Sequence, residues 1–443
     1  MKRMSRKILK LAVMLTALLL TATGCLFTSS VSDLYALPKM PEQYQELERQ
    51  IGELISGGAE YAAPISGNNL QPVQMVDLDR DGSDEAVAFF RKDNDEKPMK
   101  IFVYEAVEGS YELRCSIESS GSSIDSVRYE DLNGDGHLEL IVGWKMAADV
   151  QTLAVYNIGR EALPLMSSAY SRYTIEDINQ DGFPELFVIR GDSSSAPMVE
   201  VYMWQTNILA VAHRCALSST MVELGRGNIV NGKTAEGQRA VYITGVTEQN
   251  MAVTDILVWQ SDLLSGGSVV NAAVVEETGR SSLVLPYRQL RPVDINNDGV
   301  TEVPAPDSYS PQGDTLVEWL HCSAAGHSYE VAQTYHSLSN GWYFMIPHYW
   351  WDRVVVTVQE TMLGENQVAL FVDGVPTLAI YTLTGENREA RAVTGERFLV
   401  RRQTGIVYAA ELLEGAELYG MDVETLRNNF SMTENAWQPN GSW

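Results

Sequence analysis

Four short segments of the chain place carboxylate or amide side chains at alternate positions, followed by a glycine and then by a glutamate. The residues at loop positions 1, 3, 5 and 9 are Asp77, Asp79, Asp81, Glu85; Asp131, Asn133, Asp135, Glu139; Asp177, Asn179, Asp181, Glu185; and Asp294, Asn296, Asp298, Glu302. Calcium takes side-chain oxygens at positions 1, 3 and 5 and the backbone carbonyl at position 7, while glycine at position 6 permits the turn. Position 7 is Ser83, His137, Phe183 or Val300. The spacing therefore predicts three to four structural calcium sites, and the alternative is four polar turns without metal.

The residues after position 9 indicate that each loop leads into a strand. An EF-hand would close with a glutamate at position 12 and continue as a helix. Position 12 is Ala88, Val142, Val188 or Ala305. Runs such as ELFVIR are short, apolar and rich in β-branched or aromatic residues, which is typical of strands buried on both faces. An EF-hand or a dockerin, whose loops lead into helices, is therefore disfavoured, although the prolines of EVPAP make the fourth run a poorer strand.

The recurrence of this loop before a buried strand resembles the FG-GAP or VCBS repeat. Such repeats form blades in the β-propeller of integrin α subunits and occur in many bacterial surface proteins. The resemblance covers roughly residues 71–337 and implies a calcium-loop β-propeller with the metal ligands named above. It implies neither a ligand nor a reaction, because propellers carry many unrelated functions.

The spacing of the loops predicts about five blades. The last interval, from Asp177 to Asp294, is about twice the others, which indicates a hidden blade where Arg239 aligns with Glu185. That blade lacks the carboxylates, and we expect the guanidinium of Arg239 to replace the cation. Cys115 and Cys215 each lie 38 residues after a loop start, which predicts the same outer strand in two blades. We expect these thiols and that of Cys322 to be reduced and buried, since three cysteines do not make a disulfide framework.

The N-terminus predicts export and anchoring. Five basic residues precede an apolar stretch from Leu11 to Leu20, which is typical of a secretory signal peptide. Ala22–Cys25 resembles the lipobox of bacterial lipoproteins, which implies that Cys25 is diacylated and anchors the protein on the exported face of a bacterial cell-envelope membrane. A plain signal peptide with a chance cysteine is the alternative.

A helix is predicted before the repeats and a small domain after them. An amphipathic helix is predicted from the apolar face of Tyr44, Leu47, Ile51, Leu54 and Ile55, and it is expected to pack on the propeller edge or on the next domain. After the repeats, strand candidates and a helix capped by Asp422 predict a small α+β domain, with a weak resemblance to PsbP-like domains; further degenerate blades are the alternative. The expected organisation is a signal peptide at 1–24, a lipidated tether at 25–40, the helix at 41–60, the propeller at 61–338 and the α+β domain at 339–443.

The net charge and a search for catalytic motifs limit the classes of partner and of reaction that the sequence supports. The formal net charge is −26, and removal of the signal peptide leaves 27 basic and 58 acidic residues, a net charge of −31. Such a chain repels nucleic acid and anionic lipid, so contact with the membrane is expected through the lipid anchor only. We find no nucleophile elbow, zincin motif, P-loop or dinucleotide fingerprint, and assign no catalytic residue. A transition-metal site formed by His321, Cys322 and His327 is a minor alternative.

The aromatic cluster at 342–351 has two interpretations. Trp350 and Trp351 form either a ligand platform or part of the core, because neighbouring residues of a strand face opposite sides. We expect a cell-surface lipoprotein that acts as a calcium-stabilised binding or scaffolding module for an extracellular protein or glycan. The alternatives are an extracellular polysaccharide hydrolase or lyase and an accessory of envelope assembly. The sequence assigns no oligomeric state.

Overall fold

The computed structural model describes residues 42–148, 150–191, 197–224, 229–262, 266–285, 290–306, 316–361 and 364–433. The predicted signal peptide, Cys25 and the tether lie outside these residues. Among the described residues, no helix is both long enough and apolar enough to cross a membrane.

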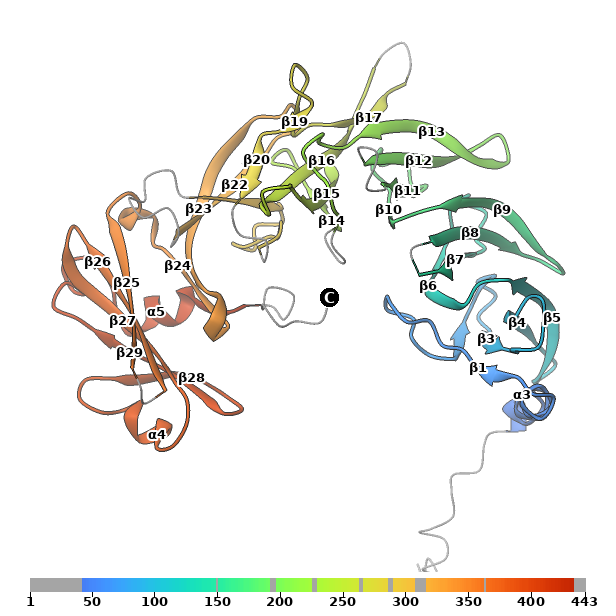
Figure 1. The fold of residues 1–443 in the computed structure, drawn as a ribbon, viewed down its shortest axis with the longest axis horizontal. Coiled ribbons are helices and arrows are strands. Elements are labelled where there is room, and N and C mark those ends of the chain that lie inside the picture. The colour runs from blue at the N-terminus through green and yellow to red at the C-terminus, as the bar shows by residue number, and fades with distance from the viewer. Residues whose placement is uncertain are drawn as a thin grey trace, which may run out of the picture.

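The chain folds mainly into antiparallel β-sheets, as predicted (Figure 1). The first sheet contains β1 (Glu60–Tyr61), β2 (Val73–Val76), β3 (Glu85–Arg91), β4 (Met99–Val107) and β5 (Ser110–Ser119). The second contains β6 (Ser123–Glu130), β7 (Glu139–Ala147), β8 (Val150–Ile158) and β9 (Ala162–Ala169). The third contains β10 (Arg172–Glu176), β11 (Glu185–Arg190), β12 (Met198–Gln205) and β13 (Ile208–Ala216). In each of the three, a predicted loop precedes the strand that begins with the position 9 glutamate.

The remaining described strands form three larger sheets and a small ribbon. The fourth sheet contains β14 (Ile229–Lys233), β15 (Arg239–Val246), β16 (Ala252–Gln260), β17 (Ser268–Asn271) and β20 (Leu283–Leu285). The ribbon pairs β18 (Val274–Val275) with β19 (Arg280–Ser281). The fifth contains β21 (Glu302–Pro306), β22 (Leu316–Cys322), β23 (Ser328–Ser337), β24 (Trp342–Met345) and β30 (Phe430–Met432). The sixth contains β25 (Val354–Thr361), β26 (Glu365–Val372), β27 (Val375–Leu383), β28 (Phe398–Gln403) and β29 (Ile406–Leu412).

Successive sheets pack face to face along an arc (Figure 1). On β7, Val142 belongs to the core shared with the first sheet, whereas Ile141 belongs to the core shared with the third. The same alternation on β11 directs Phe187 toward the fourth sheet and Val188 toward the second. This explains why the strands after the first three loops contain an apolar run between the initial glutamate and the last residues: both faces of that run are buried.

Both end faces of the arc are covered by the chain itself. Helix α3 (Gln45–Ser56) buries Leu47 and Ile51 against Ala88 and Phe90 on the outer face of the first sheet. On the outer face of the sixth sheet, Ala392, just after helix α4 (Arg388–Arg391), packs into an apolar cluster with strands β27 and β29. In a closed ring these two faces would pack on each other. The described sheets therefore form an open arc, and closure into a propeller is not confirmed.

Two predicted boundaries are corrected. The amphipathic helix, predicted over 41–60, ends at Ser56, because Gly57 caps it and Gly58 has a φ of +86° before β1 begins. The predicted boundary at residue 338 falls inside the fifth sheet, since β24 pairs with β23 and β30 pairs with β24. The terminal helix α5 (Val423–Asn429) is present, and the Asp422 carboxylate accepts the Thr425 N–H at 2.7 Å, as its predicted N-cap.

Candidate metal loops and an adjoining pocket

The four predicted loops share one backbone conformation. Position 4, which is Arg80, Gly134, Gln180 or Asn297, has φ between 55° and 73°. The glycine at position 6 has φ between 86° and 93° in all four loops, a region in which residues with a side chain are strained. The loops are therefore copies of one structure, and the glycine is required for it.

The aspartate at position 1 holds each loop closed. The Asp177 carboxylate accepts the N–H groups of Asp181 and Gly182 at 3.1 and 3.2 Å, and Asp77 and Asp294 make the equivalent bonds. The carboxylate at position 5 accepts the N–H of position 7 at 2.7 to 2.9 Å in every loop. These bonds orient the remaining carboxylate oxygens without a metal.

The glutamate at position 9 joins each loop to its strand. Its Oε2 accepts the N–H of position 2 at 2.8 or 2.9 Å in all four loops. The apolar side chains at position 2, Leu78, Leu132, Ile178 and Ile295, are buried in the cores between sheets. Burial removes water from the glutamates and raises the pKa of Glu85 and Glu185 to about 7. Neighbouring carboxylates, such as Asp79 beside Glu85, add to this rise in pKa, so a cation there would offset unfavourable negative charge.

The first loop fits a hard divalent cation best. Carboxylate oxygens of Asp77, Asp79 and Glu85 lie within 4.8 Å of one another. The Oδ1 atom of Asp79 is buried and has no hydrogen-bond partner among the described residues, while its Oδ2 receives the Arg114 guanidinium at 3.2 Å. A calcium ion among these oxygens would supply the partner that Oδ1 lacks.

The second and third loops contain an amide where the first has Asp79. In the third loop, Asn179 directs its Nδ2 to Asp181 and Glu185 at 3.0 and 2.9 Å, and Asn133 makes the same contacts in the second. An amide nitrogen does not ligate calcium, so a bound ion requires the amide to turn its oxygen inward. The donors are present in these two loops, and their fit depends on that rotation.

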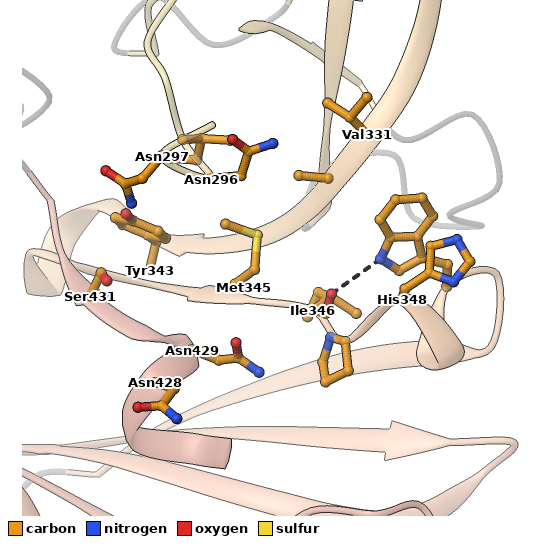
Figure 2. Close-up of a pocket in the computed structure, with 14 residues that line it drawn as sticks. Asn296, Asn297, Val331, Tyr343, Met345, Ile346, His348, Asn428, Asn429 and Ser431 are labelled. Atoms are coloured by element: carbon orange, nitrogen blue, oxygen red, sulfur yellow. Dashed lines mark hydrogen bonds between the residues drawn. The ribbon is translucent and has the colours of Figure 1, made fainter. Parts of the chain in front are cut away.

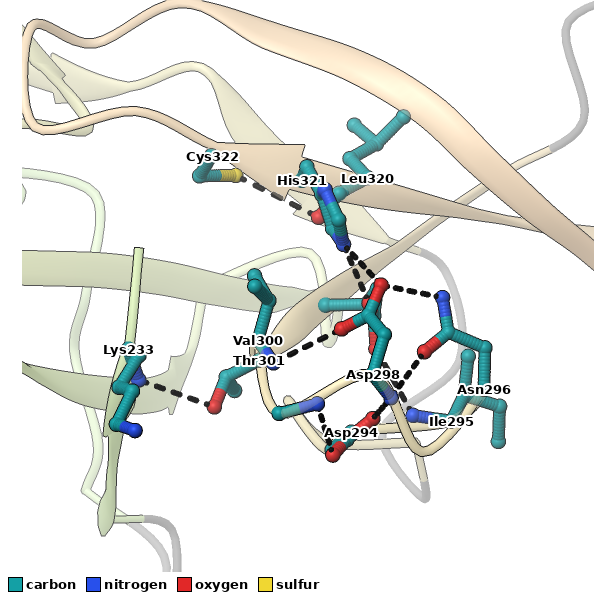
Figure 3. A network of polar contacts seen from close by, with 12 residues as sticks. Lys233, Asp294, Ile295, Asn296, Asp298, Val300, Thr301, Leu320, His321 and Cys322 are labelled. Carbon is teal, nitrogen blue, oxygen red and sulfur yellow. Dashed lines mark hydrogen bonds and ion pairs between the residues drawn. The ribbon is translucent and has the colours of Figure 1, made fainter. Parts of the chain in front are cut away.

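The fourth loop has a partner that the sequence did not reveal (Figure 3). His321 on β22 lies opposite Glu302 in register and places Nε2 2.7 Å from Glu302 Oε1 and 3.2 Å from Asp298 Oδ2. Its Nδ1 lies 3.3 Å from the Tyr329 hydroxyl. An imidazole inside the cage does not fit calcium, which prefers oxygen ligands. The prediction of an all-oxygen calcium site is therefore weakest here.

The alternative site of His321, Cys322 and His327 is wrong. Among the described residues, the candidate metal-binding group that contains His321 joins it to Asp298 and Glu302, and not to Cys322 or His327. Cys322 instead belongs to the core between the fourth and fifth sheets. The fourth loop leads into a strand despite Pro304 and Pro306, because β21 is an edge strand.

The hidden repeat has no metal loop. A tight turn replaces the loop between β14 and β15, in which Gly237 donates to the Thr234 carbonyl at 2.8 Å. Arg239 begins β15, as its alignment predicted, but its guanidinium pairs with Glu176 at the end of β10. The prediction that Arg239 replaces a cation in its own loop is wrong, because it bridges two sheets instead.

The first three loops contact one another along one edge of the arc. The Leu138 N–H donates to the Leu78 carbonyl at 2.7 Å, and Arg80 pairs with Asp131 at 3.3 Å, which joins the first loop to the second. A Cβ at Gly134 would lie 2.0 Å from the Phe183 ring, so the third loop packs directly on the second. The three loops therefore form a continuous ridge.

The cysteines match their prediction in the described residues. Cys115, Cys215 and Cys322 are buried and form no disulfide there. Cys115 on β5 and Cys215 on β13 occupy equivalent outer strands, paired with Val103 and Val199. Burial raises the pKa of the Cys215 and Cys322 thiols to about 12, which makes them poor nucleophiles.

Of the two tryptophans, Trp350 belongs to the core, and Trp351 remains a candidate for ligand contact. Trp350 is fully buried, and its Nε1 donates to the Tyr419 carbonyl at 2.9 Å, so the platform prediction is wrong for this residue. Trp351 is partly exposed and lines a pocket of about 400 Å³ (Figure 2). The pocket lies where the fourth loop meets β23, β24, β30, α5 and the 3-10 turn His348–Trp350. The sequence pointed to this site through Trp351 alone, because the other walls come from segments up to more than 130 residues apart.

Comparisons with known proteins give no family. No protein-family model matches the chain, and no curated protein gives a significant match. Among solved structures, Sqt1 of Saccharomyces cerevisiae aligns over 66% of this chain and 82% of its own, at 11% identity and a TM-score of 0.28. The polysaccharide lyase Uly1 aligns over 80% of this chain and 92% of its own, at 11% identity and a TM-score of 0.30. Scores this low carry no argument about function.

Proposed function

We propose that the chain is a lipid-anchored binding module of the bacterial cell envelope whose stacked sheets are stabilised by calcium. The observation that supports it most is the first loop, where three carboxylates converge and a buried oxygen of Asp79 lacks a partner in the described part of the chain. Calcium there would tie the loop to β3 through Glu85. The ion would act on structure, and the ridge of loops would keep neighbouring sheets in place.

The pocket supports binding over catalysis. None of its lining residues is Asp or Glu, so it offers no carboxylate pair for glycoside hydrolysis. Tyr343 and His348 are its groups able to exchange a proton, which keeps a polysaccharide lyase as the second candidate. Release of unsaturated sugars from a glycan panel would favour that candidate.

Thermal unfolding in EDTA and across a calcium titration tests the proposal on the chain from Leu26 onward, which retains every described residue. Extracellular calcium sites bind at about 0.1–1 mM, so several millimolar calcium should stabilise the chain by about 1–2 kcal/mol per occupied site. Asp79→Asn should remove part of the gain. Asp84→Asn is the matched control, because its side chain is exposed in the same loop. Identical curves with and without calcium would show that the loops are turns without metal.

Fatty-acid labelling tests the proposed lipid anchor at Cys25. A labelled fatty acid should be incorporated into the full chain in bacterial cells and not into the Cys25→Ala variant. Incorporation into both, or into neither, contradicts the proposed lipid anchor.

A further inference from the structure

The pocket is uncharged although the chain is strongly acidic. It is lined by Ile295, Asn296, Asn297, Val331, Ala332, Tyr343, Met345, Ile346, Pro347, His348, Trp351, Asn428, Asn429 and Ser431. None of these is Asp, Glu, Lys or Arg, although such residues make up 20% of the chain. A pocket without a formal charge gives an ionic ligand nothing to pair with, and burying an unpaired charge is costly. A neutral ligand therefore fits the pocket better than an ionic one.

The polar side chains of the pocket have capacity for a ligand. Asn297, Asn428, Asn429 and Ser431 have no side-chain hydrogen bond to any other residue that the structure describes. Asn296 differs, because its amide bonds Asp298 within the fourth loop at 2.9 Å. Each free amide offers two donors and an acceptor, the pattern that pairs with adjacent hydroxyl groups.

The amides approach from two opposite walls. Figure 2 shows Asn297 on the side of the fourth loop, with Asn428, Asn429 and Ser431 on the side of α5 and β30. Met345 lies between them. A ligand between these walls would receive hydrogen bonds at both of its edges.

Aromatic rings at the two ends are held in fixed orientations. The Tyr343 ring stacks on His336 with centroids 5.1 Å apart, and the Trp351 Nε1 donates to the Ile346 carbonyl at 3.1 Å. The exposed His348 ring lies 4.4 Å from the Trp351 ring. Rigid rings of this kind bind the C–H faces of sugars with little loss of conformational entropy.

We propose that this pocket binds a neutral carbohydrate, with Asn428 and Asn429 bonding its hydroxyl groups and Trp351 packing on a ring face. The volume of about 400 Å³ lies within the range of small-ligand sites and is too small for a folded protein. The inference rests on the proposed binding function and names its ligand class.

The probes are a panel of neutral trisaccharides with glucose, mannose, galactose, xylose and N-acetylglucosamine units, compared with an anionic uronate trisaccharide. Binding to the chain from Leu26 onward is followed by saturation-transfer NMR, and the affinity of each binder by calorimetry. At least one neutral sugar should bind, and the uronate should not. Asn428→Ala combined with Asn429→Ala should weaken binding about tenfold or more, because two hydrogen bonds are lost.

Control variants outside the pocket distinguish a loss of pocket contacts from a loss of folding. Asn94→Ala, in an exposed turn of the first sheet, and Tyr61→Ala, at its exposed edge, should leave affinity unchanged. Trp351→Ala should also weaken binding, with a melting temperature measured in parallel to detect misfolding. Affinity unaffected by the asparagine pair overturns the assignment, as does selective binding of the uronate or of a peptide library.

Failure of the inference is distinguishable from failure of the proposed function. If no sugar of the panel binds while calcium still raises the melting temperature, the carbohydrate pocket is wrong and the calcium-stabilised module stands. If calcium has no effect while a neutral sugar binds through Asn428 and Asn429, the reverse holds.

Discussion

His321 Nε2 lies 2.7 Å from Oε1 of Glu302, inside the cage of carboxylates that the fourth loop forms. Glu302 is fully buried, and its Oε2 is already bonded to the Ile295 N–H. The imidazole therefore satisfies the second oxygen of a carboxylate that water does not reach. One of the four loops thus has a protein side chain where calcium is expected in the others.

His321→Ala should destabilise the protein by about 1–3 kcal/mol, because a buried carboxylate oxygen loses its partner. Calcium should recover part of that loss, since the emptied cage offers the carboxylates of Asp298 and Glu302 and, once its amide turns, the oxygen of Asn296. Denaturant unfolding in EDTA and in calcium measures both effects. Tyr329→Phe is the control, because it removes only the 3.3 Å contact to Nδ1. A variant as stable as the parent would contradict the role given to this histidine.

In EDTA, the stability of the folded chain should fall as the pH rises toward neutrality. Glu85 and Glu185 have pKa values of about 7 in the folded chain against an ordinary value of 4.5, because burial disfavours their charged forms. The folded state therefore holds protons more tightly than the unfolded state. The stabilisation is complete below about pH 4.5 and is lost as the pH rises through about 7.

Urea unfolding on either side of this window, in EDTA, measures the loss. Glu185→Gln should reduce the difference between the two pH values, and calcium should restore stability at the higher pH by pairing with the carboxylates. If stability in EDTA rises steadily from about pH 5 to 8, the buried glutamates do not have the raised pKa values, because proton linkage then predicts a fall.

Gly134→Ala should destabilise the ridge of loops by about 2–3 kcal/mol, through a positive φ of 73° and overlap with the Phe183 ring. In a Phe183→Ala background the overlap is absent, and the cost should fall to about 1 kcal/mol for backbone strain alone. A double-mutant cycle by denaturant unfolding isolates the contact. Gly136→Ala has no neighbour within 4 Å of the added Cβ and should show the same cost in both backgrounds. Additive effects at Gly134 and Phe183 would mean that the two loops do not pack.

Trp350→Ala should cost about 3–5 kcal/mol, because it opens a large cavity in the core between the fifth and sixth sheets. Trp351→Ala, at a partly exposed position on the border of the same core, should cost clearly less, because part of the ring already contacts solvent. Thermal and denaturant unfolding of both variants gives the comparison, with exposed His348→Ala as the control. Equal losses for the two tryptophans would contradict the division between core and pocket.

The sequence predicted what depends on neighbouring residues. The spacing of Asp177, Asn179 and Asp181, the glycine at 182 and the apolar run after Glu185 together determine a turn and the strand that follows it. The Asp422 cap and the equivalent positions of Cys115 and Cys215 were predicted for the same reason. Each depends on a local periodicity or a repeat.

What the sequence did not reveal depends on contacts between distant segments. His321 reaches Glu302 only through the register of β21 on β22, and Arg239 finds Glu176 in another sheet. The pocket joins Asn297 to Asn428 across 131 residues. Composition does not predict whether the sheets close into a ring, because the apolar outer faces of the end sheets can pack against either a helix or another sheet.

The covering of both end faces limits how the molecule can assemble. A stack of sheets with a bare apolar face would add further copies end to end and grow into a filament, as uncapped repeat proteins do. Here Leu47 and Ile51 of α3 occupy one terminal face, and Ala392 lies in the apolar cluster of the other. Helix α3 and the segment at Ala392 therefore cover apolar surface on which another sheet could otherwise stack.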